Sequence, residues 1–349
     1  MKTIAAVLCE TSKELQIEEL EIPELKPGQV LVNVIYSGAC HSQLNEIKGL
    51  KGEDKFLPHV LGHEGSGIVE AIGRGVQKVK PGDRVVLTWI KGVGADTGSA
   101  VYKRKNGSIV NSGAISTFMT KAVISENRLV KIPDEMPLRE AALLGCAVPT
   151  GAGVIINTAR LSKGDTVAIF GIGGIGSSAL LAAKLKQASL IIAVDIFDNK
   201  LDEALRLGAT HAINAEKEDV LSKILKITDK RGVDYAIECA GKRESMESAF
   251  KSVRYQGGLC VIAGNLPQGE RISIDPFDLI KGRRIIGTWG GESSIDKDIL
   301  FYAAEYLSGR FEFDLLISDE CGLKDINKIF KEMEQGKTNR VLINMERGY

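Results

Sequence analysis

The sequence predicts an α/β protein with two domains, one β-rich and irregular and one built on a doubly wound parallel sheet. Two observations predict it. The length of 349 residues suits two domains better than one. The pattern of apolar residues also changes near residue 150, where short runs separated by Gly and Pro give way to strands that alternate with amphipathic helices.

The first domain is predicted from short apolar runs. The run Ile4–Leu8 is interpreted as a first strand, and four more are typical of a mostly antiparallel sheet: Val30–Tyr36, Gly67–Ala71, Arg84–Trp89 and Phe118–Ile124. The C-terminal segment holds two helical patterns and a strand: Asp296–Leu307, Leu323–Glu334 and Arg340–Met345. We expect this segment to return to the first domain, which then comprises residues 1–149 and 291–349.

The second domain, residues 150–290, is predicted from six apolar strands: Thr166–Phe170, Leu190–Asp195, His211–Asn214, Val233–Cys239, Leu259–Ala263 and Arg284–Trp289. Helical patterns lie between them: Ile175–Gln187, Asn199–Leu207, Asp219–Lys230 and one that begins at Glu244. Apolar strands alternating with helices indicate βαβ units, which form a parallel sheet of the Rossmann type.

Composition excludes several classes of function. Lys+Arg and Asp+Glu both number 45, so the zero net charge gives no electrostatic case for nucleic acid or an anionic membrane as partner. No apolar run approaches the roughly 20 residues needed to span a bilayer. The apolar start is too short for a signal peptide, and the six dispersed cysteines show no disulfide spacing. We therefore expect a cytoplasmic protein with reduced cysteines.

A glycine-rich turn follows the strand Thr166–Phe170 and opens a helix. Gly171, Gly173 and Gly176 occupy the G-x-G-x-x-G positions, and Gly174 and Ile175 lie between them. Such glycines permit a tight turn, close approach of a pyrophosphate and close packing of helix on strand. The helix N-terminus then favours the bound anion.

Asp195 ends the next strand, 19 residues after Gly176. A carboxylate there accepts the ribose hydroxyls of NAD and repels the 2′-phosphate of NADP. Lys200, on the following helix, could reach the same ribose, although a solvated helix lysine would occupy the same position. The alternative for the whole motif is a glycine-rich turn with an incidental aspartate.

Cys40, His63 and Cys146 are potential zinc ligands. Two cysteines and one histidine suit zinc, and three protein ligands leave the fourth position open for water or substrate. Their wide spacing alone does not select them from six cysteines and four histidines, and each could equally be a core residue.

The segments around these residues carry a resemblance: Gly38 to Ser42, the Gly62-His63-Glu64-Gly65-Ser66-Gly67 run, Pro81 to Val85, Gly145 to Gly151, Asp234 to Cys239 and Gly336 to Arg340. With the glycine turn, Asp195 and Lys200, they extend over the length of the chain. The sequence resembles the zinc-containing alcohol dehydrogenases of the medium-chain dehydrogenase/reductase superfamily. The resemblance implies a GroES-like catalytic domain beside the Rossmann domain.

The resemblance also implies roles for single residues. Cys40, His63 and Cys146 would hold one catalytic zinc, with Glu64 behind the metal. Ser42 would hydrogen-bond the substrate oxygen and begin the proton relay. Two further residues would contact the cofactor pyrophosphate, His41 and Arg340. Trp89 falls where the family places an aromatic of the substrate pocket, and a core aromatic is the equal alternative.

Three positions depart from the family pattern. Residues 90–118 contain no cysteine, so we predict no structural zinc there. Gln43 replaces the usual Asp, which predicts weaker metal retention. Asn45 stands where some members end the proton relay with a histidine. In the shortened loop, Tyr102 to Lys105 are expected to shape specificity or an oligomer contact.

The predicted function is hydride transfer between NAD(H) and an alcohol or carbonyl compound. The polar stretch Asp96–Asn111 hints at a polyol, sugar or amino alcohol. The family suggests a homodimer, joined at Arg284–Trp289, or a homotetramer. The sequence is also compatible with two alternatives: a zinc-free enone or quinone reductase of the same superfamily, and a catalytically silent nucleotide-binding protein.

Overall fold

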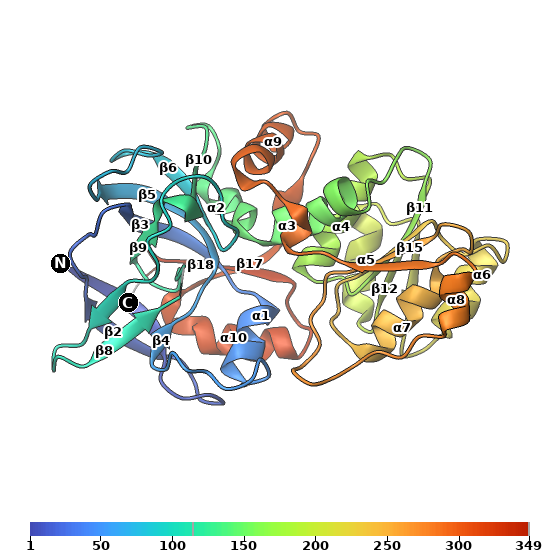
Figure 1. The fold of residues 1–349 in the computed structure, drawn as a ribbon, viewed down its shortest axis with the longest axis horizontal. Helices are drawn as coiled ribbons and strands as arrows, with labels where there is room; N and C mark the ends of the chain where they lie inside the picture. Colours follow the sequence, from blue (N-terminus) through green and yellow to red (C-terminus); the bar gives the residue numbers. More distant parts are fainter. Residues whose placement is uncertain (114, 348–349) are drawn as a thin grey trace. The chain divides into compact units, whose positions relative to one another are not determined.

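The computed structural model describes residues 1–113 and 115–347. The chain forms two compact units (Figure 1). Unit 1 holds Met1–Cys146, Ser294–Gly309 and the described residues from Ile317 onward, and unit 2 holds Ala147–Ser293 and Arg310–Leu316. Unit 1 is β-rich and unit 2 contains a parallel sheet, so the predicted α/β fold class is confirmed.

Unit 1 contains two sheets. The first is a closed barrel in the order β1 (Lys2–Leu8), β2 (Gln16–Glu21), β7 (Val101–Lys103), β8 (Ile109–Ser112) and β4 (His59–Val60). The second has the order β10 (Leu129–Lys131), β6 (Arg84–Thr88), β5 (Glu64–Ile72), β3 (Gln29–Gly38), β18 (Arg340–Asn344) and β17 (Ile317–Gly322), and β9 (Lys121–Ser125) also pairs with β3.

The C-terminal strand lies inside the second sheet, between β3 and the edge strand β17. β18 pairs antiparallel with β3, and Leu342 stands opposite Gly38. Arg340, two residues before Leu342, therefore lies beside the segment that leads from β3 into Cys40. In this way the sheet brings the two ends of the chain together at the metal-ligand candidates.

The helices of unit 1 include α1 (His41–Ile47), α2 (Leu138–Ala141), α9 (Ile295–Leu307) and α10 (Ile326–Glu334), with short 3-10 turns η1 (Glu126–Arg128), η2 (Ala142–Gly145) and η6 (Leu323–Asp325). α10 is amphipathic, because the apolar side chains that it buries recur at helical spacing: Ile326, Ile329, Phe330 and Met333. The ring of Phe330 meets that of Phe118 edge-on at 6.0 Å between centroids.

The segment from residue 90 to residue 113, which includes β7 and β8, makes internal contacts with the rest of unit 1. Tyr102 is fully buried, and its hydroxyl accepts a hydrogen bond from the backbone N–H of Val123 at 2.8 Å. Arg104 donates two hydrogen bonds to the carboxylate of Glu18, at 2.5 and 2.9 Å. The expectation that this stretch shapes specificity is thus wrong for Tyr102, which is a core residue, and Arg104 is engaged in an internal ion pair.

Glu126 is a buried carboxylate that holds two loops. It accepts backbone N–H bonds from Gln77 and Lys78 at 2.6 and 2.7 Å and from Ala95 at 2.9 Å. Burial alone would raise the pKa of Glu126, but the hydrogen bonds from Ala95, Gln77 and Lys78 outweigh it and lower the pKa below 4.5.

We expect Glu126→Gln to lower the free energy of unfolding by about 2–3 kcal/mol at pH 7, because one amide cannot accept all three N–H groups. The folded-state pKa is depressed, so the contribution of Glu126 is present above pH 4.5 and is lost as the pH falls through the folded-state value. Urea titrations at pH 7 and pH 3.5 measure it. Exposed Glu135→Gln is the control, and an equal loss there would contradict the assignment.

Unit 2 holds a six-stranded parallel sheet in the order β13 (His211–Asn214), β12 (Leu190–Asp195), β11 (Thr166–Phe170), β14 (Tyr235–Glu238), β15 (Leu259–Ile262) and β16 (Arg284–Gly287). The chain continues from β13 to β14 on the other side of β11, so the strand order reverses between β11 and β14. Sheets of this type bind ligands at the carboxyl ends of the strands at that point.

The helices of unit 2 form two groups. α4 (Gly174–Leu185) packs on α5 (Asp198–Leu207), and α6 (Val220–Ile227) packs on α7 (Arg243–Ser252). Right-handed crossovers place the two pairs on opposite faces of the sheet. The remaining segments of unit 2 are short: α3 (Ala147–Gly153), α8 (Pro276–Ile280), the π-helical turn Val154–Thr158 and the 3-10 turns Gly290–Glu292 and Phe313–Leu316.

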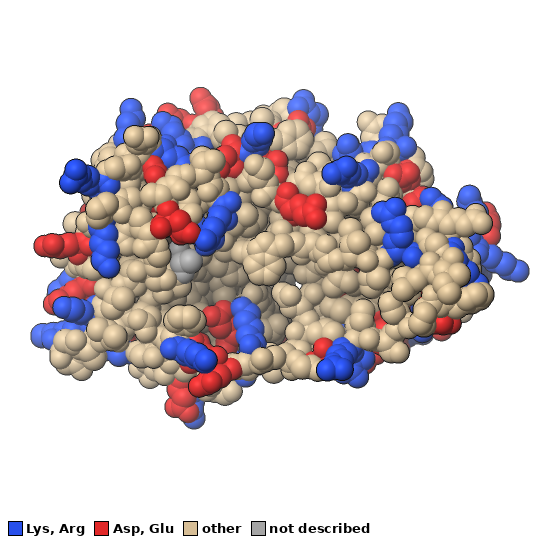
Figure 2. All heavy atoms as spheres, viewed as in Figure 1, with Lys and Arg blue, Asp and Glu red and all other residues tan. Residues whose placement is uncertain are grey.

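Charged side chains of both signs are interspersed over the visible face of the molecule (Figure 2). That distribution is consistent with the zero net charge. No single helix among the described residues has the length and apolar character needed to cross a membrane, and one bent pair, residues 138–145 with 147–158, meets those criteria only when taken together.

Candidate metal and dinucleotide sites

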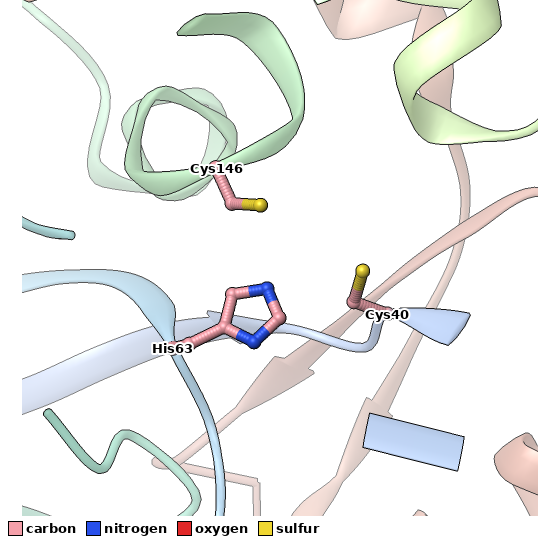
Figure 3. A group of neighbouring side chains, drawn as sticks. All are labelled: Cys40, His63 and Cys146. Atoms are coloured by element: carbon pink, nitrogen blue, oxygen red, sulfur yellow. The ribbon is translucent and has the colours of Figure 1, made fainter. Parts of the chain in front are cut away.

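The three predicted zinc ligands lie together in unit 1 (Figure 3). Cys40 lies between β3 and α1, His63 between β4 and β5, and Cys146 directly after η2. The candidate ligand atoms all lie within 4.8 Å of one another. Two donor atoms on one zinc ion stand no more than about 4.6 Å apart, so the arrangement needs only small adjustments to hold the ion.

The polar atoms of this group suit a metal better than they suit one another. Nε2 of His63 is buried and has no hydrogen-bond partner among the described residues. The ring turns one nitrogen toward the two sulfur atoms (Figure 3). A hydrogen bond with Cys146 lowers the pKa of the Cys40 thiol well below its usual value, and the charge of Arg340 adds to that effect against the opposing influence of burial. The donor set therefore fits zinc.

Two glycines make room for the carboxylate behind this group. A Cβ at Gly38 would collide with the carboxylate of Glu64, and one at Gly145 would lie 2.7 Å from its Cβ. These glycines flank the two cysteine segments. They explain why Gly precedes each cysteine so closely and why Glu64 can be fully buried there.

Glu64 forms a buried ion pair with Arg340. The Arg340 guanidinium also donates a hydrogen bond to the carbonyl oxygen of Ala39 at 2.8 Å. Both side chains are buried, with 4% and 0% exposed for Arg340 and Glu64. Burial disfavours the charged guanidinium, but the charges of Glu64 and the two cysteines raise the pKa of Arg340 above its usual value. No local sequence pattern predicts this pair, because its members are 276 positions apart.

Three other residues predicted to belong to the site lie in unit 1, close in sequence to Cys40 or to β6. Ser42 is half-buried in the first turn of α1, two residues from Cys40, and His41 is exposed beside it. Trp89 follows β6, is partly buried and packs against the hydrophobic core of unit 1. Trp89 therefore contributes to the hydrophobic core, as one of its two predicted roles required.

Gln43 is buried at 1% exposure and its Oε1 accepts a hydrogen bond from the backbone N–H of Cys40 at 3.2 Å. Its amide nitrogen has no partner within the part of the chain described. A neutral side chain thus supports the backbone of Cys40, at a position where a carboxylate would add negative charge near the metal.

We expect Gln43→Asp to slow zinc loss to a chelator by about tenfold, because outer residues tune metal affinity by such factors. Zinc release can be followed with a chromophoric chelator. Gln43→Asn has the length of Asp without its charge and serves as the matched control. Equal release rates for the Asp and Asn variants would show that charge at this position does not govern retention.

The glycine turn in unit 2 has the geometry expected of a phosphate-binding loop. Gly171 has a φ of +85°, and a Cβ there would lie 2.6 Å from the backbone nitrogen of Ala240. A Cβ at Gly176 would collide with the carbonyl oxygen of Gly171, whereas the space beside Gly173 is open. Gly173 caps α4, so the open space adjoins a helix N-terminus, which favours an anion.

Asp195 ends β12 directly beside this turn. Its Oδ2 accepts the backbone N–H of Ile172 at 2.7 Å, and its Oδ1 accepts those of Ile196 and Phe197 at 2.8 and 3.1 Å. Lys200 is buried at 7% exposure, with its Nζ 5.3 Å from the centre of the Phe197 ring. The alternative of a solvated helix lysine is therefore wrong for Lys200.

A second group of metal-binding side chain types was not anticipated. Glu46, Asp54 and His59 also bring ligand atoms within 4.8 Å of one another. These side chains already have internal partners, because Lys51 bonds Glu46 at 2.9 Å and Asp54 bonds His59 at 2.7 Å. The group fastens the segment between α1 and β4.

Family models match both parts of the chain. Residues 26–134 match the alcohol dehydrogenase GroES-like domain, and residues 174–303 match the zinc-binding dehydrogenase model. The chain is 34% identical to S-(hydroxymethyl)glutathione dehydrogenase of Komagataella pastoris, over 99% of this chain and 98% of that protein. It is 33% identical to a probable S-(hydroxymethyl)glutathione dehydrogenase 1 of Schizosaccharomyces pombe, over 98% and 97%.

Solved structures of alcohol dehydrogenases share the fold of this chain. An alcohol dehydrogenase zinc-binding domain protein from Burkholderia ambifaria superposes with a TM-score of 0.91 at 33% identity. Benzyl alcohol dehydrogenase from Acinetobacter calcoaceticus superposes with 0.89 at 32% identity. Each match covers 99% of both chains. With the cysteine–histidine group and the glycine turn in place, this chain belongs to the zinc-containing alcohol dehydrogenase family of the medium-chain dehydrogenase/reductase superfamily and is an oxidoreductase of the alcohol dehydrogenase type.

Proposed function

We propose that this oxidoreductase depends on one catalytic zinc per chain and uses NAD to interconvert an alcohol and its carbonyl partner. The observation that carries the proposal is the cluster of Cys40, His63 and Cys146, whose ligand atoms lie within 4.8 Å of one another with an unpaired His63 nitrogen turned inward. A zinc-free reductase would have no need of this donor set.

The residues of unit 1 would divide the work as follows. Cys40, His63 and Cys146 would hold the ion, which supplies Lewis acidity when bound. The Ser42 hydroxyl would hydrogen-bond the substrate oxygen and accept its proton. Arg340 would keep Glu64 in place behind the ligands through their buried ion pair. Because Asn45 has no basic group, it would not take the proton from Ser42, which would pass it on to solvent.

The residues of unit 2 would bind NAD. The N–H groups at the start of α4 and the open space beside Gly173 suit a pyrophosphate. The Asp195 carboxylate suits a ribose with two free hydroxyls and would repel the extra phosphate of NADP. By the family resemblance, His41 and Arg340 would contact the pyrophosphate.

We also propose a homo-oligomer in the cytoplasm. β16 is the edge strand of its sheet, and apolar side chains around it are exposed, Ile280 at 77% and Trp289 at 78%. A second copy of the chain would cover them and pair with the strand edge. The molar mass in solution checks the assembly, and a monomer would contradict it.

The proposed cytoplasmic location is supported by the cysteines. All six are free thiols, which suits a reducing compartment.

Elemental analysis of carefully purified protein is the first test. One zinc per chain, together with alcohol-dependent reduction of NAD, would support the proposal. The substrate screen would contain polyols and amino alcohols, benzyl alcohol, and the glutathione adduct of formaldehyde, which the names of the relatives suggest. Protein without metal would overturn the zinc dependence. Two zinc ions per chain would overturn the prediction that residues 90–118 hold none.

A further inference from the structure

Glu238 is a buried carboxylate at the carboxyl end of β14, with no solvent exposure. Its Oε1 accepts the backbone N–H groups of Ala240 and Gly241, both at 2.9 Å. Its backbone carbonyl accepts those of Ala263 and Gly264 at 2.8 and 2.9 Å. One residue therefore fixes the loops that follow two neighbouring strands, β14 and β15.

The loop that Glu238 holds lies against the glycine turn. The N–H of Cys239 donates to the carbonyl oxygen of Phe170 at 2.7 Å. A Cβ at Gly171 would lie 2.6 Å from the nitrogen of Ala240. The position of Ala240 is thus linked to the turn on one side and to the Glu238 carboxylate on the other.

The loops after β14 and β15 pack so closely that two of their glycines could not carry a side chain. A Cβ at Gly264 would lie 2.6 Å from Oε2 of Glu238, and one at Gly241, where φ is +67°, would lie 2.6 Å from the carbonyl oxygen of Asn265. Burial raises the pKa of Glu238 above its usual value, while its hydrogen bonds with the Ser245 side chain and with backbone N–H groups act in the opposite direction.

The topology tells which half of a dinucleotide these loops would meet. Asp195 stands at the end of β12, on one side of β11, and would receive the adenosine ribose. The pyrophosphate would lie at the turn after β11. The second nucleotide half must then extend over the ends of β14 and β15, on the other side of the point where the strand order reverses.

We propose that Glu238 is a positioning residue for the nicotinamide half of the cofactor, because its carboxylate holds the Cys239–Gly241 loop against the glycine turn. Its hydrogen bonds of known length go to the loops after β14 and β15, and Asp195 bonds instead to Ile172, Ile196 and Phe197. The proposal rests on the proposed use of NAD. Loss of the carboxylate should weaken the binding of the whole dinucleotide and spare that of its adenosine fragment.

The test compares NADH and AMP binding to the holoenzyme, by fluorescence and calorimetry. In Glu238→Ala the Kd for NADH should rise about tenfold, which corresponds to about 1.4 kcal/mol. The Kd for AMP should change less than about twofold, because AMP lacks the nicotinamide half that the Glu238 loops would meet. Glu238→Gln keeps an oxygen that can accept both N–H groups, so it should restore most of the NADH affinity.

Asp234, which immediately precedes the opposite end of β14, gives a matched control. It accepts the N–H of Thr166 at 2.9 Å and the Nε–H of Arg254 at 2.6 Å, so Asp234→Ala should lower the melting temperature and leave both Kd values unchanged. Equal weakening of AMP and NADH in Glu238→Ala, or no weakening at all, would overturn the inference alone. Wild-type enzyme that fails to bind NADH would overturn the proposed cofactor and the inference with it.

Discussion

Cys146→Ser is expected to abolish zinc binding and alcohol-dependent NAD reduction together. A serine hydroxyl is a far poorer zinc ligand than a thiolate, and two protein ligands cannot hold the ion against dilution. We expect less than about 0.1 zinc per chain and a fall in kcat/KM of at least about 1,000-fold, since the lost Lewis acid supplies several kcal/mol of stabilisation to the reaction.

The same variant should still bind NADH, because the glycine turn and Asp195 belong to unit 2 and Cys146 to unit 1. Binding therefore separates loss of metal from loss of folding. Cys321→Ser is the matched control: burial raises the pKa of Cys321 to about 12, and this thiol is outside the ligand group. Full zinc content in Cys146→Ser, or equal loss in Cys321→Ser, would contradict the ligand assignment.

The parallel sheet was predictable because its signals are local. The strands Thr166–Phe170, Leu190–Asp195 and His211–Asn214 have the predicted bounds. Each contains an apolar run that stops at a glycine or at a polar residue. The glycine turn was equally clear, because three glycines in six positions each answer a separate steric demand.

The β-rich unit was harder to predict because its stabilising contacts are distant in sequence. The strands Gln16–Glu21 and Ile317–Gly322 were missed, since both are polar and half-exposed and neither shows an apolar alternation. For the metal group, residue types and spacing left every cysteine a possible core residue. Only the surrounding motifs selected two cysteines and one histidine as ligands: Cys40, His63 and Cys146. The pairing of β18 with β3 that brings Arg340 to Cys40 has no local signal at all.

Among these distant contacts, the ion pair of Arg340 and Glu64 is expected to have the largest effect on stability. Both groups are withdrawn from water. Removing one partner leaves the other charge buried without compensation, which typically costs 3–5 kcal/mol. Arg340→Met keeps most of the side-chain volume, and we expect it to lower the free energy of unfolding by about 3–5 kcal/mol for that reason.

A double-mutant cycle tells whether the loss comes from the charge or from packing. If the uncompensated Glu64 carboxylate causes it, adding Glu64→Gln to Arg340→Met should recover most of the stability, because the neutral amide is much cheaper to bury. Denaturant titration of the zinc-loaded protein, with zinc content measured in parallel, gives the four values. If the two changes simply add, the ion pair contributes nothing specific, and Arg340 stabilises this region through its hydrogen bond to Ala39 and its packing.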